Sequence, residues 1–215
     1  MRSTIATGRT VDEAILNGTE ELGLSPDSVT VEIISRGDRT QSDSEEPQAK
    51  VRVSEKISTE LVEKARSFLA DLIKQMKFSG DVTGKSQGKC ISLEVWNSAE
   101  GSILIGYRGI TLNALQHLVG QYMNRDWKPG QDRIEIRVDT QDYRQRRERL
   151  LSKMAMDAVK KARITGQAVS LETMNDVDRK FVHLLVKDLD DMESNSQGDG
   201  DERHIVISKK SYSSY

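Results

Sequence analysis

The tetrapeptide Gly106-Tyr107-Arg108-Gly109 constrains the fold of this chain more than any other short segment. Glycine adopts positive φ without strain, so two glycines around two larger residues predict a sharp bend. A helix that begins at such a bend presents unpaired amide groups and the positive end of its dipole. The segment is therefore typical of a phosphate-binding loop, although a lone Gly-x-x-Gly is a weak signal. The apolar residues that follow at helical spacing are Leu112, Leu115, Leu118, Val119, Tyr122 and Met123.

The segments around this bend alternate between helical and strand periodicity. Residues 57–76 predict a helix with Ser58 as its N-cap. Residues 79–84, 89–96 and 133–138 predict strands, since apolar and polar residues alternate in the latter two. The expected order is helix, strand, strand, short helix, glycine loop, helix, strand, which indicates an α+β fold.

The N-terminal segment predicts a small βαββ unit. Strands are expected at 3–8 and 29–34, around a helix over 10–21 that Thr10 caps and Glu13 completes as a capping box. Residues 35–48 contain no apolar side chain, and we expect an exposed, mobile loop there. One helix on two or three strands buries little surface, so we expect this unit to be stabilised by packing against another domain or another chain.

The C-terminal third predicts two helices and a strand. The helix expected over 142–163 carries eight Lys or Arg residues and only three acidic ones. The helix expected over 176–190 places Arg179 and His183 at i and i+4, hence on one face, with Asn175 one turn earlier. The predicted core faces are Tyr143, Leu150, Met154, Ala158 and Ala162 on the first helix, and Val177, Phe181, Leu184, Leu185 and Leu189 on the second.

Charge is distributed unevenly over a chain whose net charge is only −2. Residues 133–163 hold ten basic and five acidic side chains, whereas residues 172–202 hold three basic and ten acidic ones. A basic segment in the middle of the chain attracts phosphate locally without causing nonspecific binding by the whole chain. No apolar run is long enough to span a bilayer and no signal peptide is visible, so we expect a cytoplasmic protein without membrane insertion.

An enzymatic function is not expected from this sequence. The single cysteine excludes an intramolecular disulfide, and the three histidines are scattered along the chain. No metal site, thiol nucleophile, P-loop or dinucleotide fingerprint is recognisable, so neither a metal nor a cofactor is predicted.

The element order and the glycine loop over residues 55–138 resemble a KH domain of the type common in bacteria. The resemblance implies that Gly106, Tyr107, Arg108 and Gly109 clamp the backbone of about four unpaired nucleotides. It also implies an apolar groove for the bases, lined by Ile105, Ile110 and Leu112. The family usually has Lys or Arg where Tyr107 stands.

Residues 139–210 resemble the Arg-three-His domain, a small module that binds single-stranded nucleic acid. The resemblance rests on Met174-Asn175, on the spacing of Arg179 and His183, and on Ser196, Gly198 and Arg203 before an alternating strand. It implies that Arg179 contacts phosphate as a fixed cation and His183 as a switchable one. Asn175, Ser196, Gly198 and Arg203 match the remaining family positions, and the usual proline before Met-Asn is Thr173 here.

The whole chain is similar to the Jag family, in which residues 1–54 correspond to the family's N-terminal domain. The segment at 35–48 is polar and acidic where that family commonly has a basic loop with glycine and phenylalanine. The resemblance implies an RNA-binding regulator of cell elongation, division and cell shape in Gram-positive bacteria. It also implies a second, smaller KH protein as a partner, and the KH domain could support a homodimer.

Two functions remain open from the sequence. In the first, the chain binds single-stranded RNA, or single-stranded DNA, through two weak modules linked in one molecule. Alternatively, it is an adaptor of the cell-wall and elongation machinery that binds nucleic acid only incidentally. Replacing Gly106 and Gly109 by Asp is expected to abolish loop binding while leaving the fold intact. Since aromatic residues make up only 5% of the chain, little base stacking is expected.

Overall fold

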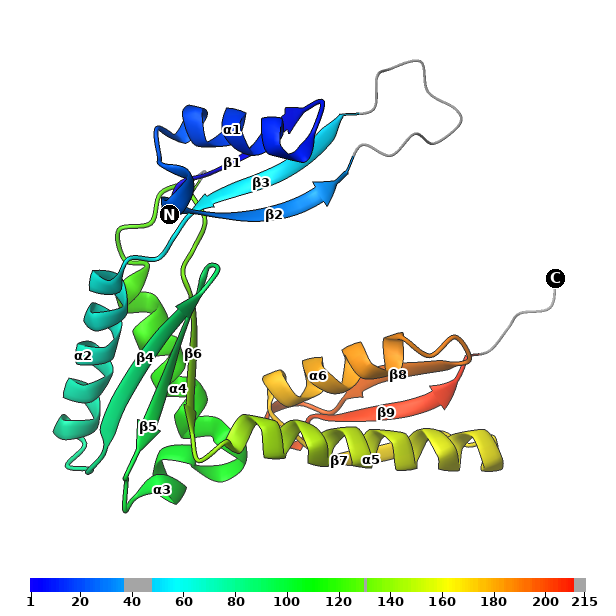
Figure 1. The fold of residues 1–215 in the computed structure, drawn as a ribbon. Helices are drawn as coiled ribbons and strands as arrows, with labels where there is room; N and C mark the ends of the chain where they lie inside the picture. Colours follow the sequence, from blue (N-terminus) through cyan, green and yellow to red (C-terminus); the bar gives the residue numbers. More distant parts are fainter. Residues whose placement is uncertain (37–47, 130, 211–215) are drawn as a thin grey trace. The chain divides into compact units, whose positions relative to one another are not determined.

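The computed structural model describes residues 1–36, 48–129 and 131–210. It is a mixed α+β fold, as the sequence predicts, and it contains three three-stranded sheets (Figure 1). The chain divides into two compact units. The first comprises Met1–Glu100 and Asn113–Asp139, and the second comprises Gly101–Leu112 and the chain from Thr140 onward. Most of the predicted mobile loop, residues 37–47, lies outside the described residues.

The N-terminal sheet has the order β1-β3-β2, and α1 lies on one face of it (Figure 1). Thr10 caps α1 by accepting a hydrogen bond from the Glu13 amide at 3.2 Å. The Glu13 carboxylate accepts from the Arg9 amide at 2.7 Å and not from Thr10, so the predicted capping box is displaced by one residue. The elements are β1 (Ser3–Gly8), α1 (Val11–Leu22), a 3-10 turn (Pro26–Ser28), β2 (Val29–Ser35) and β3 (Ala49–Glu55).

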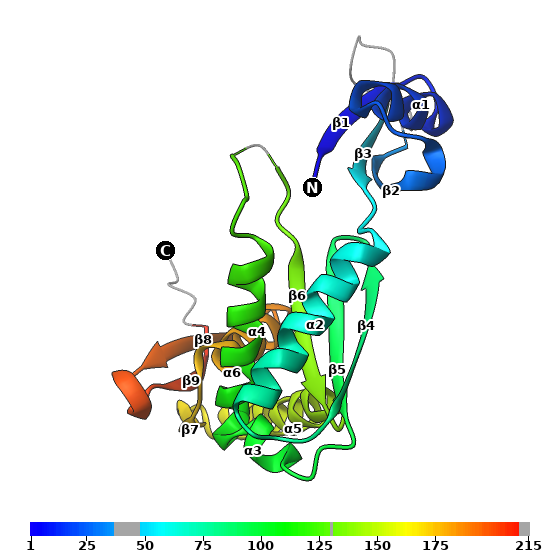
Figure 2. The same ribbon diagram turned by 90° about the vertical axis from the view of Figure 1, so that its left-hand side faces the viewer.

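The middle sheet has the order β4-β5-β6. Helix α2 packs along β4 and β5 (Figure 2), and the Ser58 hydroxyl caps its first turn as predicted. Ile91, Leu93 and Val95 of β5 are buried, which confirms the alternation in the sequence. The Phe68 ring of α2 stacks on the Tyr122 ring of α4, with centroids 3.9 Å apart. The elements are α2 (Thr59–Gln75), β4 (Asp81–Gln87), β5 (Cys90–Trp96), α4 (Ile110–Met123) and β6 (Glu135–Thr140).

The second unit contains a sheet of order β7-β9-β8, with α5 and α6 packed on each other and on the sheet. Gly166 ends α5 in the left-handed conformation, with φ of 71°. The elements are α3 (Gly101–Ile105), a 3-10 turn (Tyr107–Gly109), α5 (Tyr143–Thr165), β7 (Val169–Thr173), α6 (Asp176–Lys187), β8 (Met192–Gln197), a 3-10 turn (Gly200–Glu202) and β9 (His204–Lys209).

The predicted core faces of both C-terminal helices are partly wrong. On α5, Leu150 is 48% exposed, whereas its neighbour Leu151 is buried with Ala155 and Val159. On α6, Val182 and Val186 are buried, and the predicted core residues Val177 and Leu184 are exposed. Each helix carries two adjacent apolar rows, and the row that meets Met174, Met192, Ile205 and Ile207 is the one that is buried. The sequence shows both rows but not which of them the sheet covers.

A candidate nucleic-acid interface

Asn175 is the N-cap of helix α6, and its side chain accepts a hydrogen bond from a first-turn amide that has no backbone acceptor. The Asn175 Oδ1 accepts from the Asp178 amide at 2.8 Å. Asp176 and Asp178 in the first turn complement the positive end of the helix dipole. The Arg147 guanidinium of α5 donates to one Asp178 carboxylate oxygen at 2.8 and 3.1 Å, in a largely buried ion pair. The positive end of the α6 dipole is thereby already balanced by carboxylates. An anionic ligand therefore finds stronger attraction from the cations along the side of α6 than from its first turn.

Two parallel rows of side chains run along the exposed side of α6. Arg179, His183 and Lys187 recur every four residues, and so do Asp176, Lys180 and Leu184. Both rows line a hollow of about 350 Å³, together with Ser196 of β8 and Arg203 just before β9. Four cationic side chains and one carboxylate therefore surround this hollow. We call it the α6 hollow; its charge and the exposed Leu184 suit a sugar–phosphate strand that carries bases.

Hydrogen bonds within the protein orient three of these side chains. The Arg179 Nη1 donates to the Met174 carbonyl at 2.7 Å. The His183 Nδ1 lies 2.8 Å from the Ser194 hydroxyl. The Arg203 Nε donates to the Ser196 hydroxyl at 2.9 Å. Side chains fixed in this way lose less conformational entropy when they bind a ligand.

The structure brings four predicted residues to this hollow: Arg179, His183, Ser196 and Arg203. Asn175 caps α6 instead of lining the hollow. Gly198 shapes the turn between β8 and β9, where φ is 81° and a Cβ would lie 2.8 Å from the Glu202 carbonyl oxygen. The sequence prediction missed Asp176, Lys180, Leu184 and Lys187. Lys187 follows His183 by four residues and so lies on the same face of the helix; this spacing could have revealed Lys187 from the sequence.

The glycine loop forms the predicted sharp bend between α3 and α4. Gly106 and Gly109 have φ of 70° and 82°. A Cβ on Gly106 would lie 2.2 Å from the Thr111 hydroxyl, and one on Gly109 would lie 2.7 Å from the Tyr143 ring. The expectation that aspartate at both positions leaves the fold intact is therefore wrong, since both changes force neighbouring atoms apart.

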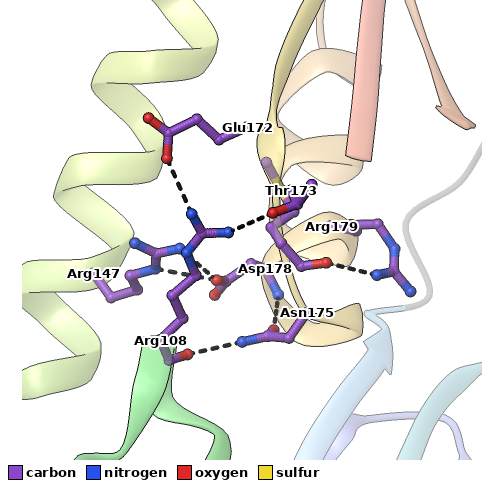
Figure 3. A network of polar contacts seen from close by, with 8 residues as sticks. Arg108, Arg147, Glu172, Thr173, Asn175, Asp178 and Arg179 are labelled. Atoms are coloured by element: carbon purple, nitrogen blue, oxygen red, sulfur yellow. Dashed lines mark hydrogen bonds and ion pairs between the residues drawn. The ribbon is translucent and has the colours of Figure 1, made fainter. Parts of the chain in front are cut away.

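The loop offers less to a phosphate than its sequence suggests. The amides of Gly106, Gly109 and Ile110 already donate to backbone carbonyls. The Arg108 guanidinium donates to the Thr173 hydroxyl at 3.0 Å and to the Glu172 carboxylate at 3.3 Å (Figure 3). Tyr107 and Ile110, by contrast, are 73% and 60% exposed.

The predicted apolar groove is only partly at the surface. Ile105 is half-buried, and Ile110 is exposed as a groove residue must be. Leu112 has no exposed surface, so it belongs to the core and does not line a groove in this structure.

Residues 1–36, 48–129 and 131–210 hold neither a candidate metal site nor a candidate membrane span. No cluster of three or more His, Cys, Asp or Glu side chains there is placed to hold a metal ion. None of the described helices combines the length and apolar character that crossing a bilayer requires.

Comparison with known families agrees with the geometry of the C-terminal unit. Residues 149–209 match the Arg-three-His (R-three-H) domain, and residues 6–39 match the Jag N-terminus. The second unit thus contains an Arg-three-His domain, and the α6 hollow lies within it.

Full-length relatives identify the family. The chain is 33% identical to the RNA-binding protein KhpB of Bacillus subtilis (strain 168), over 98% of this chain and 100% of the relative. It is 31% identical to the RNA-binding protein KhpB of Clostridium symbiosum, over 98% of this chain and 93% of the relative. The chain belongs to the Jag family, which includes these KhpB proteins.

Proposed function

We propose that this protein is a cytoplasmic, non-enzymatic regulator that binds single-stranded RNA, with the α6 hollow as its main phosphate-binding site. The observation that carries the proposal is the convergence of Arg179, Lys180, Lys187 and Arg203 around one hollow beside His183. Cations arranged along a groove follow a flexible phosphate backbone, and the exposed Leu184 offers an apolar contact for a base or sugar. The relatives' name, RNA-binding protein, supports RNA as the ligand.

The second part of the proposal is that residues 55–138 form a KH domain whose glycine loop contributes to the same activity. Support comes from the order α2, β4, β5, α3, glycine loop, α4, β6 and from the two positive-φ glycines. The exposed Tyr107 and Ile110 are the loop residues best placed to contact bases. Family resemblance extends the proposal to control of cell elongation and division, with a smaller KH protein as partner.

The test is the affinity of the full-length protein for an unstructured RNA, measured by fluorescence anisotropy. Lys180→Ala with Lys187→Ala removes two exposed cations of the α6 hollow, and we expect an affinity loss of about tenfold or more. The matched control is Lys153→Ala with Lys160→Ala, which removes the same charge from exposed positions of α5 outside the hollow and should change little. Equal affinities for both double variants and the unmodified protein would favour the adaptor function instead.

A further inference from the structure

Arg108 is tied to the protein itself, although it stands between the two glycines of the loop. Its guanidinium bonds Thr173 of β7 and the adjacent Glu172, and its side chain is only 21% exposed. Arg108 also has φ of 51°, a left-handed conformation that is uncommon outside glycine. An arginine that served mainly as a phosphate ligand would extend its donors toward solvent.

The backbone of the loop is held at the same place. The Asn175 Nδ2 donates to the Arg108 carbonyl at 2.8 Å, while the Oδ1 of the same amide caps α6. The buried Gly109 lies against the Tyr143 ring of α5. One side-chain amide therefore fixes both the loop and the start of α6.

The Arg179 side chain is anchored to this connection as well. Its guanidinium donates to the Met174 carbonyl, so Arg108 and Arg179 both bind the Thr173–Asn175 connection (Figure 3). Arg179 follows Asn175 by four residues, about 6 Å along the helix axis. The glycine loop and Arg179 of the α6 hollow thus contact the same three-residue connection within one compact unit.

The glycine loop and the α6 hollow expose different kinds of side chain, which suit different parts of an RNA strand. The loop presents an aromatic and an aliphatic side chain, Tyr107 and Ile110, and the α6 hollow presents cations. The Arg108 guanidinium lies 4.9 Å from the centroid of the Tyr107 ring, which helps to hold the ring in place. Bases can stack at the loop while phosphates follow α6.

We propose that Arg108 is a positioning residue, and that it joins the glycine loop and the α6 hollow into one continuous site for a single RNA strand. This inference rests on the proposed function and adds two points to it. Arg108 does not contact phosphate, and the two parts bind one strand together instead of acting as independent modules. A rigid link places the second part at a high effective concentration once the first has bound.

Two RNA lengths separate this role from a direct phosphate contact. A strand of about four nucleotides occupies the loop alone, and one of about twelve spans both parts. Binding of the short strand is followed by the amide shifts of Tyr107 and Ile110 in NMR spectra, and binding of the long strand by anisotropy. Thermal unfolding of each full-length variant shows whether the fold persists.

Arg108→Lys retains the charge but replaces the planar fork, whose two terminal nitrogens reach Thr173 and Glu172 separately, by a single ammonium nitrogen on a shorter reach. We expect it to lower long-strand affinity about tenfold, to lower short-strand affinity by much less than that, and to leave the salt dependence unchanged. Thr173→Val removes the acceptor without any change of charge and should reproduce this result, whereas Thr173→Ser retains the hydroxyl and should behave as the unmodified protein.

Three results would overturn the inference. Unchanged long-strand affinity in Thr173→Val would show that the bond does not join the two parts. An equal loss on both strands would show that Arg108 serves the loop alone. Retained binding in Arg108→Lys, with loss and a shallower salt slope in Arg108→Ala, would make Arg108 a phosphate ligand. If the unmodified protein bound neither strand, the proposed function itself would fail.

Discussion

Gly109 is one of the two loop glycines that leave no room for a side chain. Its φ of 82° and the nearby Tyr143 ring both require glycine. We expect Gly109→Ala to destabilise the second unit by about 2 kcal/mol, through backbone strain and overpacking. Hydrogen exchange of the α5 amides in the full-length protein measures this.

Gly120 provides the matched control for that change. It lies inside α4, and a Cβ there would meet no atom within 4 Å. Gly120→Ala should raise stability by about 0.5–1 kcal/mol, since alanine favours a helix. Equal effects of the two changes would contradict the account of the loop.

Tyr143 carries a buried hydroxyl for which no hydrogen-bond partner is found among the described residues. A buried hydroxyl without a partner costs stability, so Tyr143→Phe should raise the free energy of unfolding by about 1 kcal/mol. Chemical denaturation, followed through the second unit, checks this. A loss of stability would show that the hydroxyl is bonded in solution.

Burial also raises the pKa of the Tyr143 phenol. In the unfolded chain the phenol loses its proton near pH 10, while in the folded chain it keeps it to higher pH. The unfolded state then binds fewer protons, so stability falls as pH rises above about 10. Tyr143→Phe should reduce this alkaline loss, and an unchanged pH profile would contradict the assignment.

At the scale of elements, the Arg147–Asp178 pair fixes α6 against α5. Both side chains are largely buried, so Arg147→Ala leaves a buried carboxylate without its cation. We expect a loss of about 3 kcal/mol in the free energy of unfolding, measured by hydrogen exchange of α6 amides.

The exposed Arg163–Asp191 pair is the control for that prediction. Its two hydrogen bonds are 2.6 and 2.7 Å long, but Arg163→Ala should cost much less stability than Arg147→Ala because water screens the pair. Hydrogen bonding to Arg163 lowers the pKa of Asp191, so the pair's contribution is present at neutral pH and is lost as acid protonates Asp191. A larger loss for Arg163→Ala than for Arg147→Ala would contradict the burial argument.

The elements also show what the sequence could and could not predict. Caps at Thr10 and Ser58, and the ends of α1 and α5 at Gly23 and Gly166, depend on local chemistry and were predictable. The buried row of α6 depends on which side the sheet covers, so Val182 and Val186 were missed. Arg108 lies 65 residues before its partner Thr173, and no local pattern encodes such a contact.

At the scale of the whole molecule, function depends on where charge is exposed and not on net charge. The chain as a whole is nearly neutral, yet four cations surround the α6 hollow. The acidic residues between 172 and 202 include Asp176 and Asp178, which complement the start of α6. The net charge of residues 172–202 therefore did not predict the cationic hollow, because side chains adjacent in sequence point to different faces of α6.

The dependence of RNA affinity on salt tests the central claim most directly. For single strands, the slope of log affinity against log salt changes by roughly 0.7 for each phosphate contact. We predict a steep fall in affinity with salt for the unmodified protein, and a slope shallower by roughly 1.4 for the Lys180→Ala, Lys187→Ala variant. An affinity that does not depend on salt, or a variant with the unmodified slope, would contradict the assignment of the α6 hollow as the phosphate-binding site.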